Sequence, residues 1–305
     1  MWGTWLGSAG RPCEGWGYAA SHRRDTLRSP DCPYALSPRA SLAWSPIRRA
    51  QTRPPVTWVA TTIGKPAMRI MIVGASRGLG RALVEGVCRA GDTVVGVSRR
   101  RPDAVTLPPG VELQWIEADM ASPAEAAAHI AQAAPSAFDV LICNVGIWEA
   151  TAFTDSYAFL DEPDDAIVDL VNVNITATLL LLKRLVPRVL QSRKPQVILT
   201  GSTSALRQSG RPEVAFGASK FALNGVADAL REGFRGSRLA VTCLQLGNLN
   251  TDDALSVPIE EAAARGDGGL VPVHDVVAVV RTLLHLSDAA FVRELVMPAI
   301  ADERF

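Results

Sequence analysis

From Met68 onward, short apolar stretches alternate along the chain with longer amphipathic ones. The short stretches predict seven strands, at residues 69–73, 93–98, 113–116, 139–143, 196–200, 239–244 and 294–297. Between them, helical patterns occur at about 79–90, after Ser122-Pro123, and at about 164–190, 215–235 and 274–286. Such alternation is typical of a parallel sheet with helices on both faces. The sequence therefore predicts an α/β, doubly wound parallel sheet of about seven strands, in a single domain over residues 68–305.

Residues 1–67 have a different composition. They hold five of the seven tryptophans and nine Lys and Arg against three Asp and Glu, and they show no sustained helical or strand period. One interpretation is an Arg- and Ser-rich targeting peptide. The other is a disordered N-terminal extension, with Met68 as the natural first residue. The absence of an amphipathic helix favours the disordered extension.

Charge and cysteine usage narrow the class of protein. After residue 67 the chain carries 22 Lys and Arg against 28 Asp and Glu, a mildly acidic balance that gives no support to nucleic-acid or anionic-membrane binding. The five cysteines are scattered without metal-ligand spacing, which predicts no metal site and a reducing, cytoplasmic location. The apolar run Leu179–Leu182 is followed by Lys183 and Arg184, and it predicts a buried helix rather than a membrane span.

A glycine-rich loop lies between the first predicted strand and the first predicted helix. Gly74, Gly78 and Gly80 follow the spacing Gly-x-x-x-Gly-x-Gly. Glycines there permit a tight turn, and the helix that follows presents its positive N-terminal end to a pyrophosphate. The pattern predicts a dinucleotide site of the Rossmann type. Its expected contact residues in the loop are Gly74, Ser76, Arg77, Gly78, Leu79 and Gly80.

The end of the second predicted strand indicates which dinucleotide is bound. An acidic residue there would bind the ribose hydroxyls of NAD, but the strand ends in Ser98 and Arg99. Arg77 in the glycine loop can approach from the other side, and two guanidinium groups suit the 2′-phosphate of NADP. The alternative is that Arg99 is a solvated surface residue. The residues favour NADP (NADPH).

These features, together with Asn144-Val145-Gly146 after the fourth strand and Ala-Ser-Lys220 in the helix at 215–235, resemble the short-chain dehydrogenase/reductase family from about Met68 onward. The resemblance implies further cofactor contacts. The expected positions are Asp119 and Met120 at the adenine, Asn144, Val145 and Gly146 along the ribose, Lys220 at the nicotinamide ribose, Gly247 in the turn after the sixth strand, and Thr251 at the carboxamide.

The resemblance also implies four catalytic positions, and one of them is altered. Asn174 corresponds to the asparagine of a proton relay, with Asn172 as the competing candidate. Ser202 corresponds to the serine that binds the substrate carbonyl, with Thr203 and Ser204 close by. Lys220 is present, but the tyrosine four residues before it is replaced by Phe216. A phenyl ring cannot donate a proton, and general acid catalysis is typically worth roughly 10²–10⁴-fold in rate.

Three interpretations of Phe216 follow. Another group supplies the proton, either Tyr157 or a water held by Ser202, Asn174 and Lys220. Alternatively, the fold carries non-redox chemistry, or it binds NADP without turnover as a sensor or partner subunit. The matching cofactor positions favour an NADP-dependent oxidoreductase that transfers hydride to or from a carbonyl or secondary alcohol. The family resemblance further implies a homodimer or homotetramer, and a substrate-binding lid over residues 248–272.

Overall fold

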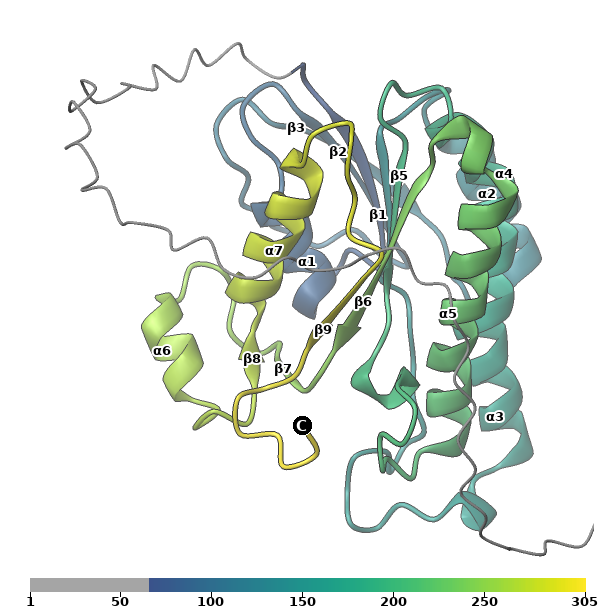
Figure 1. Ribbon diagram of the computed structural model, residues 1–305, viewed down its shortest axis with the longest axis vertical. Coiled ribbons are helices and arrows are strands. Elements are labelled where there is room, and N and C mark those ends of the chain that lie inside the picture. The colour runs from purple at the N-terminus through teal and green to yellow at the C-terminus, as the bar shows by residue number, and fades with distance from the viewer. Residues whose placement is uncertain (1–65) are drawn as a thin grey trace, which may run out of the picture. The chain divides into compact units, whose positions relative to one another are not determined.

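The computed structural model describes residues 66–305, so the prediction for residues 1–67 falls almost entirely outside it. Seven parallel strands form one sheet in the order β3-β2-β1-β4-β5-β6-β9 (Figure 1). This confirms the predicted fold class. The strands are β1 (Arg69–Val73), β2 (Thr93–Ser98), β3 (Glu112–Glu117), β4 (Val140–Cys143), β5 (Gln196–Thr200), β6 (Ala240–Leu246) and β9 (Glu294–Met297).

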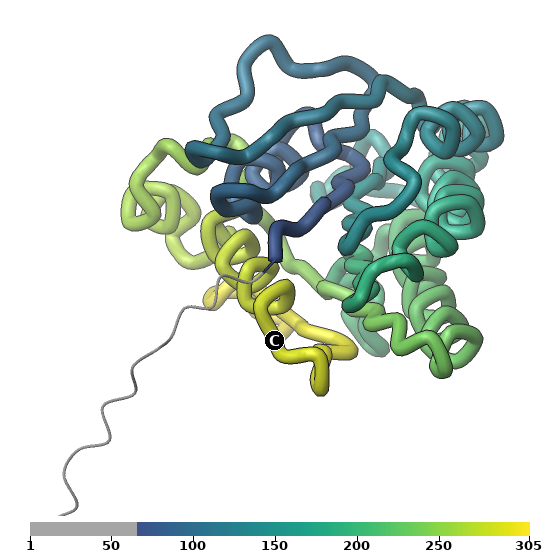
Figure 2. The backbone as a smooth tube through the Cα atoms, turned by 90° about the horizontal axis from the view of Figure 1, so that it is seen from above, coloured from purple at the N-terminus to yellow at the C-terminus, as the bar shows by residue number. Residues whose placement is uncertain are grey.

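Helices cover both faces of this sheet (Figures 1 and 2). Successive strand side chains point to opposite faces, so Ile70 and Ile72 enter one apolar core while Met71 and Val73 enter the other. The first core packs against α1 (Gly78–Gly86) and α7 (Val273–His285). The second packs against α2 (Pro123–Ala133), α4 (Ala177–Val189) and α5 (Val214–Gly233).

The long helix predicted at 164–190 is interrupted. It consists of α3 (Asp164–Val171), a wider π turn η2 (Asn172–Thr176) and α4. Such turns are rare and are frequently found at functional sites. Pro187 lies in the last turn of α4, and the helix continues past it to Val189.

By length and composition, the helical run over residues 164–189 is the one stretch between residues 66 and 305 that could cross a membrane. From the short apolar segment at 179–182, the sequence predicted a buried helix and no membrane-spanning stretch. In the fold, however, α4 buries one face against the sheet, and the core helix of a soluble domain meets the same criteria.

One predicted boundary was wrong, since the first helix ends at Gly86 rather than near residue 90. The segment 248–272, where the family resemblance implies a substrate-binding lid, contains regular structure. It forms a two-stranded ladder, β7 (Leu249–Asn250) with β8 (Val271–Pro272), around α6 (Ile259–Ala264). The remaining short helices are η1 (Phe159–Asp161), η3 (Thr203–Ala205) and η4 (Arg235–Ser237).

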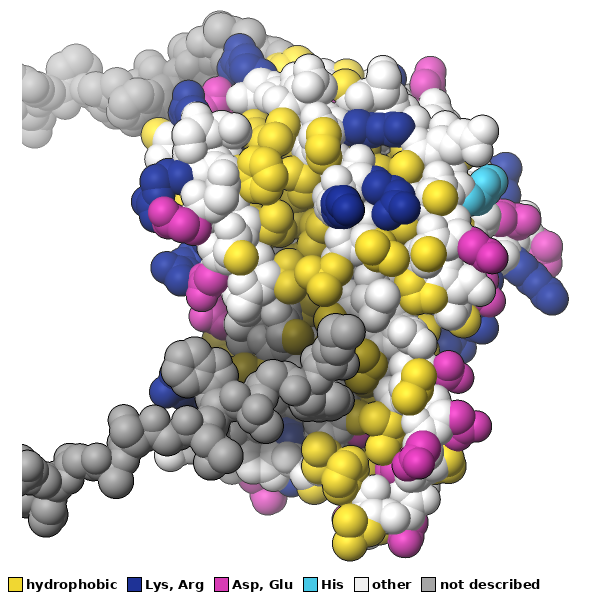
Figure 3. All heavy atoms as spheres, turned by 90° about the vertical axis from the view of Figure 1, so that its right-hand side faces the viewer, with side chains coloured by type: hydrophobic (Ala, Val, Ile, Leu, Met, Phe, Trp, Pro, Cys, Tyr) yellow, Lys and Arg dark blue, Asp and Glu magenta, His cyan; other side chains and the backbone are white. Residues whose placement is uncertain are grey.

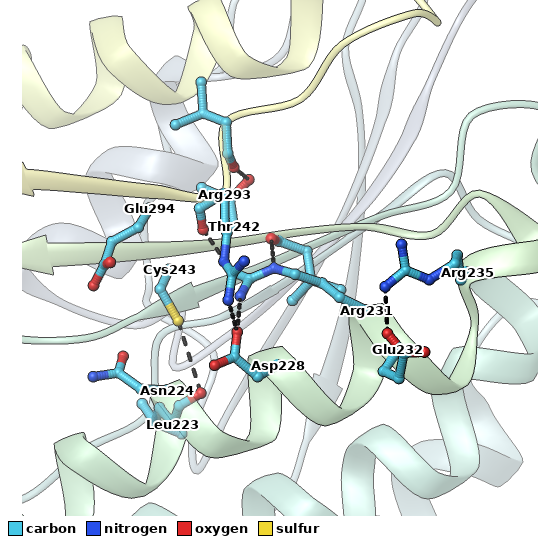
Figure 4. A network of polar contacts seen from close by, with 12 residues as sticks. Leu223, Asn224, Asp228, Arg231, Glu232, Arg235, Thr242, Cys243, Arg293 and Glu294 are labelled. Atoms are coloured by element: carbon cyan, nitrogen blue, oxygen red, sulfur yellow. Dashed lines mark hydrogen bonds and ion pairs between the residues drawn. The ribbon is translucent and has the colours of Figure 1, made fainter. Parts of the chain in front are cut away.

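A polar network fixes α5 against β6 and the segment that leads into β9 (Figure 4). The Asp228 carboxylate accepts hydrogen bonds from Arg231 at 2.7 Å and from Arg293 at 2.6 Å. Arg231 also donates to the backbone oxygens of Val241 and Arg293. Because α5 also carries Phe216 and Lys220, this network helps to position the site described next.

Candidate active site

A cavity of about 1030 Å³ opens at the carboxyl ends of the strands. Its wall is built from the segments that follow β1, β2, β3, β4, β5 and β6, together with residues of α5 and of the 248–272 segment. In doubly wound sheets, ligands bind at this edge. The volume is at the upper end of the range for small-molecule sites, and it suits a dinucleotide with a second, smaller ligand.

The glycine loop is shaped by contacts that leave no room for a side chain. Gly74 has φ +86°, and a Cβ atom there would lie 2.4 Å from the Asn144 carbonyl oxygen. A Cβ at Gly80 would lie 1.8 Å from the Gly74 oxygen. These glycines bring α1, the loop and the turn after β4 into close contact. The N-terminus of α1 therefore faces a backbone-lined cradle, which fits a pyrophosphate.

Most of the predicted cofactor residues line this one cavity. Gly80 lies behind the loop, where its role is the close contact with Gly74. The predicted residues that line the cavity are Gly74, Ser76, Arg77, Gly78, Leu79, Ser98, Arg99, Asp119, Met120, Asn144, Val145, Gly146, Lys220, Gly247 and Thr251. The structure thus brings together positions that are spread over more than 170 residues of sequence.

Arg77 and Arg99 both line the cavity, and both are exposed. Neither guanidinium has a hydrogen-bond or ion-pair partner within residues 66–305. Ser98 is buried, and its hydroxyl donates to the Arg100 carbonyl oxygen at 2.7 Å, so it is occupied in the turn. The glycine loop and the end of β2 therefore each offer the cavity one arginine, and position 98 carries no competing carboxylate.

Lys220 is held at the centre of the cavity. Its Nζ donates to the Thr200 carbonyl oxygen at 3.1 Å and lies 5.7 Å from the centroid of the Phe216 ring. Desolvation by burial lowers the pKa of Lys220 to about 8. Phe216 lines the same cavity, so a phenyl ring stands where the family resemblance expects a phenol.

Asn174 rather than Asn172 is built into the site. Asn174 is buried in the π turn, where its side chain accepts from the Ile147 N–H at 2.8 Å and donates to the Ile147 oxygen at 2.8 Å. It also donates to the Ser219 hydroxyl at 2.9 Å. Asn174 does not line the cavity itself. Its amide fixes the turn that carries Gly146, and so one wall of the cavity.

Ser202 lines the cavity, as do Thr203 and Ser204. The Ser202 hydroxyl oxygen accepts a hydrogen bond from the Ser204 N–H at 3.1 Å, which leaves its own proton available for another acceptor. Its backbone N–H donates to Gln245 Oε1 at 3.1 Å. This arrangement is compatible with a donor to a substrate oxygen.

Tyr157 is not among the cavity-lining residues. Its hydroxyl oxygen accepts from the Val214 N–H at 2.9 Å, and the hydroxyl lies 3.4 Å from Glu149 Oε1. Desolvation, followed by the neighbouring Glu149 carboxylate, raises the pKa of Tyr157. Tyr157 is one of the two proton sources that the sequence suggested, and the fold packs it at the N-terminus of α5.

Three residues around Phe216, namely Trp148, Phe153 and Glu149, had no signal in the sequence. Trp148, Phe153 and Phe216 pack edge to face, with ring centroids 5.2–6.4 Å apart. Behind them, the buried carboxylate of Glu149 accepts from the N–H groups of Ala215 and Phe216, at 3.0 and 3.1 Å. No sequence motif connects these positions, because they meet only through the packing of the 144–157 segment on α5.

A metal site and a reactive cysteine are two other kinds of site that could carry chemistry here. Within residues 66–305, no group of three or more His, Cys, Asp or Glu is placed to hold a metal ion. The described cysteines, Cys88, Cys143 and Cys243, are free and buried. Burial raises the pKa of Cys143 to about 12, so its thiol stays protonated and unreactive.

Comparison with known proteins gives a consistent result. Residues 68–261 match the family described as short chain dehydrogenase. An uncharacterized short-chain type dehydrogenase/reductase of Sinorhizobium fredii is 26% identical over 75% of this chain and 90% of its own length. The NADPH-dependent pterin aldehyde reductase of Arabidopsis thaliana is 28% identical over 61% of this chain and 76% of its own. An alcohol dehydrogenase from the archaeon Thermococcus sibiricus, solved with 5-hydroxy-NADP, superposes with a TM-score of 0.63. It is 17% identical over 78% of this chain and 98% of its own.

The fold and the cavity together define a nicotinamide-dinucleotide-binding oxidoreductase scaffold. The match over residues 68–261 shows the family, and the chain belongs to the short chain dehydrogenases.

Proposed function

We propose that this protein is an NADP-dependent oxidoreductase that interconverts a carbonyl compound and the corresponding secondary alcohol. The observation that carries the proposal is the shared cavity. The glycine cradle, the two unpartnered arginines, Ser202 and Lys220 all face one space at the carboxyl edge of the sheet. A cofactor along one end of this space leaves room for a substrate beside Ser202.

The residues divide the work of cofactor binding. The backbone around Gly74 and Gly78, with the N-terminus of α1, would hold the pyrophosphate, while Arg77 and Arg99 would bind the 2′-phosphate. Solved proteins of this fold hold either NADP or NAD, so the choice of NADP rests on these two arginines. Lys220 would bind the nicotinamide ribose. When bound, the nicotinamide supplies or accepts the hydride.

The proton must come from a group other than residue 216. Tyr157 does not line the cavity, because its hydroxyl is hydrogen-bonded to the Val214 N–H at the start of α5. Of the two proton sources that the sequence suggested, a water in contact with Ser202 and Lys220 would therefore supply the proton to the substrate oxygen. Ser202 would donate its hydroxyl proton as a hydrogen bond to that oxygen, and the Lys220 ammonium would favour negative charge there. Asn174 would act by positioning the turn at Gly146 and Ile147.

The test is NADPH consumption by the full chain against a broad panel of carbonyl compounds, beside Phe216→Tyr. We expect measurable turnover by the unaltered chain, and an increase of about 10²–10⁴-fold in Phe216→Tyr, because a phenol near a cation supplies general acid catalysis. Turnover only in Phe216→Tyr would instead show an intact scaffold whose natural role is to bind NADP without carbonyl reduction.

Cofactor choice is tested separately by equilibrium titration. NADPH should bind more tightly than NADH by at least about tenfold, or roughly 1.4 kcal/mol. A smaller ratio would refute the roles given to Arg77 and Arg99 while leaving the oxidoreductase proposal in place. The measurement needs no substrate, so the two outcomes are independent.

A second copy of the chain is the proposed macromolecular partner. Hydrophobic side chains gather on the face that carries α3, α4 and α5 (Figure 3). Exposed apolar residues on these helices are Val168, Val171, Leu179, Val214 and Phe221. Analytical ultracentrifugation of the full chain should give a dimer or tetramer, and a monomer at micromolar concentration would rule this out. A cytoplasmic location and the absence of nucleic-acid and membrane partners stay predictions.

A further inference from the structure

The end of the cavity beyond Phe216 is aromatic. Phe153 lies 5.2 Å from Phe216 with the ring planes at 90°, and Trp148 lies 6.1 Å from Phe153 and 6.4 Å from Phe216. All three residues line the cavity. Rings at these distances touch each other edge to face, so they form a continuous wall rather than an open cage around a cation.

Much of this wall is exposed. Trp148 is 56% exposed and Phe153 42%, whereas Phe216 is only 7% exposed. Apolar and aromatic side chains that line a cavity are typical of ligand-binding sites, where the ligand covers them. Each square ångström of apolar surface removed from water is worth about 25 cal/mol, so a ring placed on this wall gains binding energy from a preformed surface.

The wall is held in place from behind. Phe153 has φ +67°, a left-handed conformation that is strained for a bulky side chain. Its N–H donates to the Glu213 carboxylate at 3.0 Å, and Glu213 is buried. Glu149, also buried, binds the backbone of Ala215 and Phe216. Two buried carboxylates therefore fix two of the three rings.

The charges near this end disfavour an anionic ligand. Arg211 lines the cavity but forms an ion pair with Asp302 at 3.1 Å, with both side chains largely buried. A carboxylate on the ligand would have to compete with Asp302 for that guanidinium. The Asp169 carboxylate also lines the cavity and would repel a negatively charged ligand. The wall itself has no titrating side chain.

We infer that the substrate carries its carbonyl or alcohol group on a neutral, planar, apolar ring system that packs against Trp148, Phe153 and Phe216. This inference rests on the proposed oxidoreductase function and names its substrate class. Phe216 then serves as part of the substrate-binding wall. The role follows from its contacts with Phe153 and Trp148, which a residue serving only as a proton donor would not require.

The test compares two ketones of the same carbon skeleton, planar 2-acetylnaphthalene and saturated 2-acetyldecalin. Binding to the full chain is measured by calorimetry in the presence of NADP⁺, which cannot reduce either ketone, so affinity is read without turnover. We expect the planar ketone to bind at least about tenfold more tightly, because stacking on an aromatic wall requires a flat partner.

Substitutions in the aromatic wall test whether the preference for the planar ketone arises there. Trp148→Leu should weaken binding of the planar ketone by about five- to tenfold and that of the saturated ketone by less than about twofold. Phe291→Leu is the matched control, since Phe291 is 46% exposed but does not line the cavity, and it should change neither affinity. Because Trp148 is mostly exposed, its replacement is not expected to disturb folding.

Each outcome separates the inference from the proposed function. Equal affinity for the two ketones, or an unchanged planar preference in Trp148→Leu, overturns the inference even if the enzyme reduces other carbonyls. A planar preference that is lost in Trp148→Leu supports it. If that preference is present but NADPH is never consumed with any ketone, the wall binds rings as inferred and the oxidoreductase proposal is the one that fails.

Discussion

The two ends of the cavity are built in different ways. At the cofactor end, the shape depends on backbone contacts that only glycine permits, and the groups offered to a ligand are main-chain N–H groups and two arginines. At the substrate end, the shape depends on three aromatic side chains held by buried carboxylates from other segments. The first construction suits a ligand of fixed chemistry. A site built from side chains can be altered by one substitution. Phe216 is an example, because a phenyl ring there stands where the family resemblance expects a phenol.

The most direct way to break the cofactor end is Gly80→Ala. The added Cβ would lie 1.8 Å from the Gly74 carbonyl oxygen, which is backbone and cannot give way cheaply. We expect a loss of about 3 kcal/mol or more in the free energy of unfolding, and loss of NADPH binding. Thermal unfolding and NADPH titration measure the two effects.

The matched control is Gly225→Ala in α5, where a Cβ would meet nothing within 4 Å. This variant should be neutral or more stable by up to about 1 kcal/mol, since alanine favours a helix over glycine. Equal behaviour of the two variants would show that the contact of α1 with the loop is not what shapes the cradle.

Lys220, which lies between the two ends, gives the second largest effect. Burial lowers its pKa from 10.5 to about 8, so the unfolded chain binds more protons than the folded one between these values. The free energy of unfolding should therefore rise between about pH 8 and 10.5, by roughly 3 kcal/mol, because loss of the proton removes the cost of burying the ammonium. Below about pH 8 this residue should add no pH dependence.

Denaturant titrations of the cofactor-free protein across this pH range measure the effect. In Lys220→Met the rise should be absent, whereas Lys183→Met, on the exposed side of α4, should keep it. A rise of the same size in Lys220→Met would assign the pH dependence to other groups and remove the case for a strongly desolvated ammonium.

Arg99→Ala sharpens the account of cofactor choice. Loss of one guanidinium from the 2′-phosphate should raise the Kd for NADPH by about tenfold and leave the Kd for NADH within about twofold. Arg101→Ala is the control, because Arg101 is exposed nearby but does not line the cavity. Equal weakening of NADH and NADPH would point to a general charge effect instead of phosphate recognition.

The smallest effect is expected at the support of the aromatic wall. Glu149→Gln keeps an acceptor for the N–H groups of Ala215 and Phe216 but removes the negative charge from the N-terminus of α5. We expect a loss of about 1 kcal/mol, or about 2–4 °C in Tm. Glu125→Gln, in the exposed first turn of α2, should lower Tm by less than half as much. The reverse order would contradict the capping role of Glu149.

The sequence predicted the parts of this protein that depend on local pattern. The strand sequence, the helices on both faces and the glycine loop each have a period or spacing that a short window reveals. The fold confirms the strands and the helices. The π turn at 172–176 and the ladder of β7 with β8 were missed, because their residues form neither a regular period nor a turn motif.

The substrate end was less predictable for a physical reason. Tyr157 was one of the two proton sources that the sequence suggested, but the direction of its side chain depends on the hydrogen bond from Val214, 57 residues later. Similarly, the pairing of Phe153 with Glu213 joins residues 60 positions apart. Contacts of this kind arise from packing between segments, which no local pattern in either segment specifies.

The strand order has a consequence for how the domain reaches its native state. In the sheet, β6 pairs with β5 and β9, and Cys243 is matched with Glu294, 51 residues further along the chain. During synthesis, one edge of β6 stays unpaired until the last strand emerges, and such edges recruit other chains. Since every pair in the sheet is also parallel and non-local, folding should be slow. The window between synthesis and closure of β9 is therefore when this domain is most exposed to aggregation.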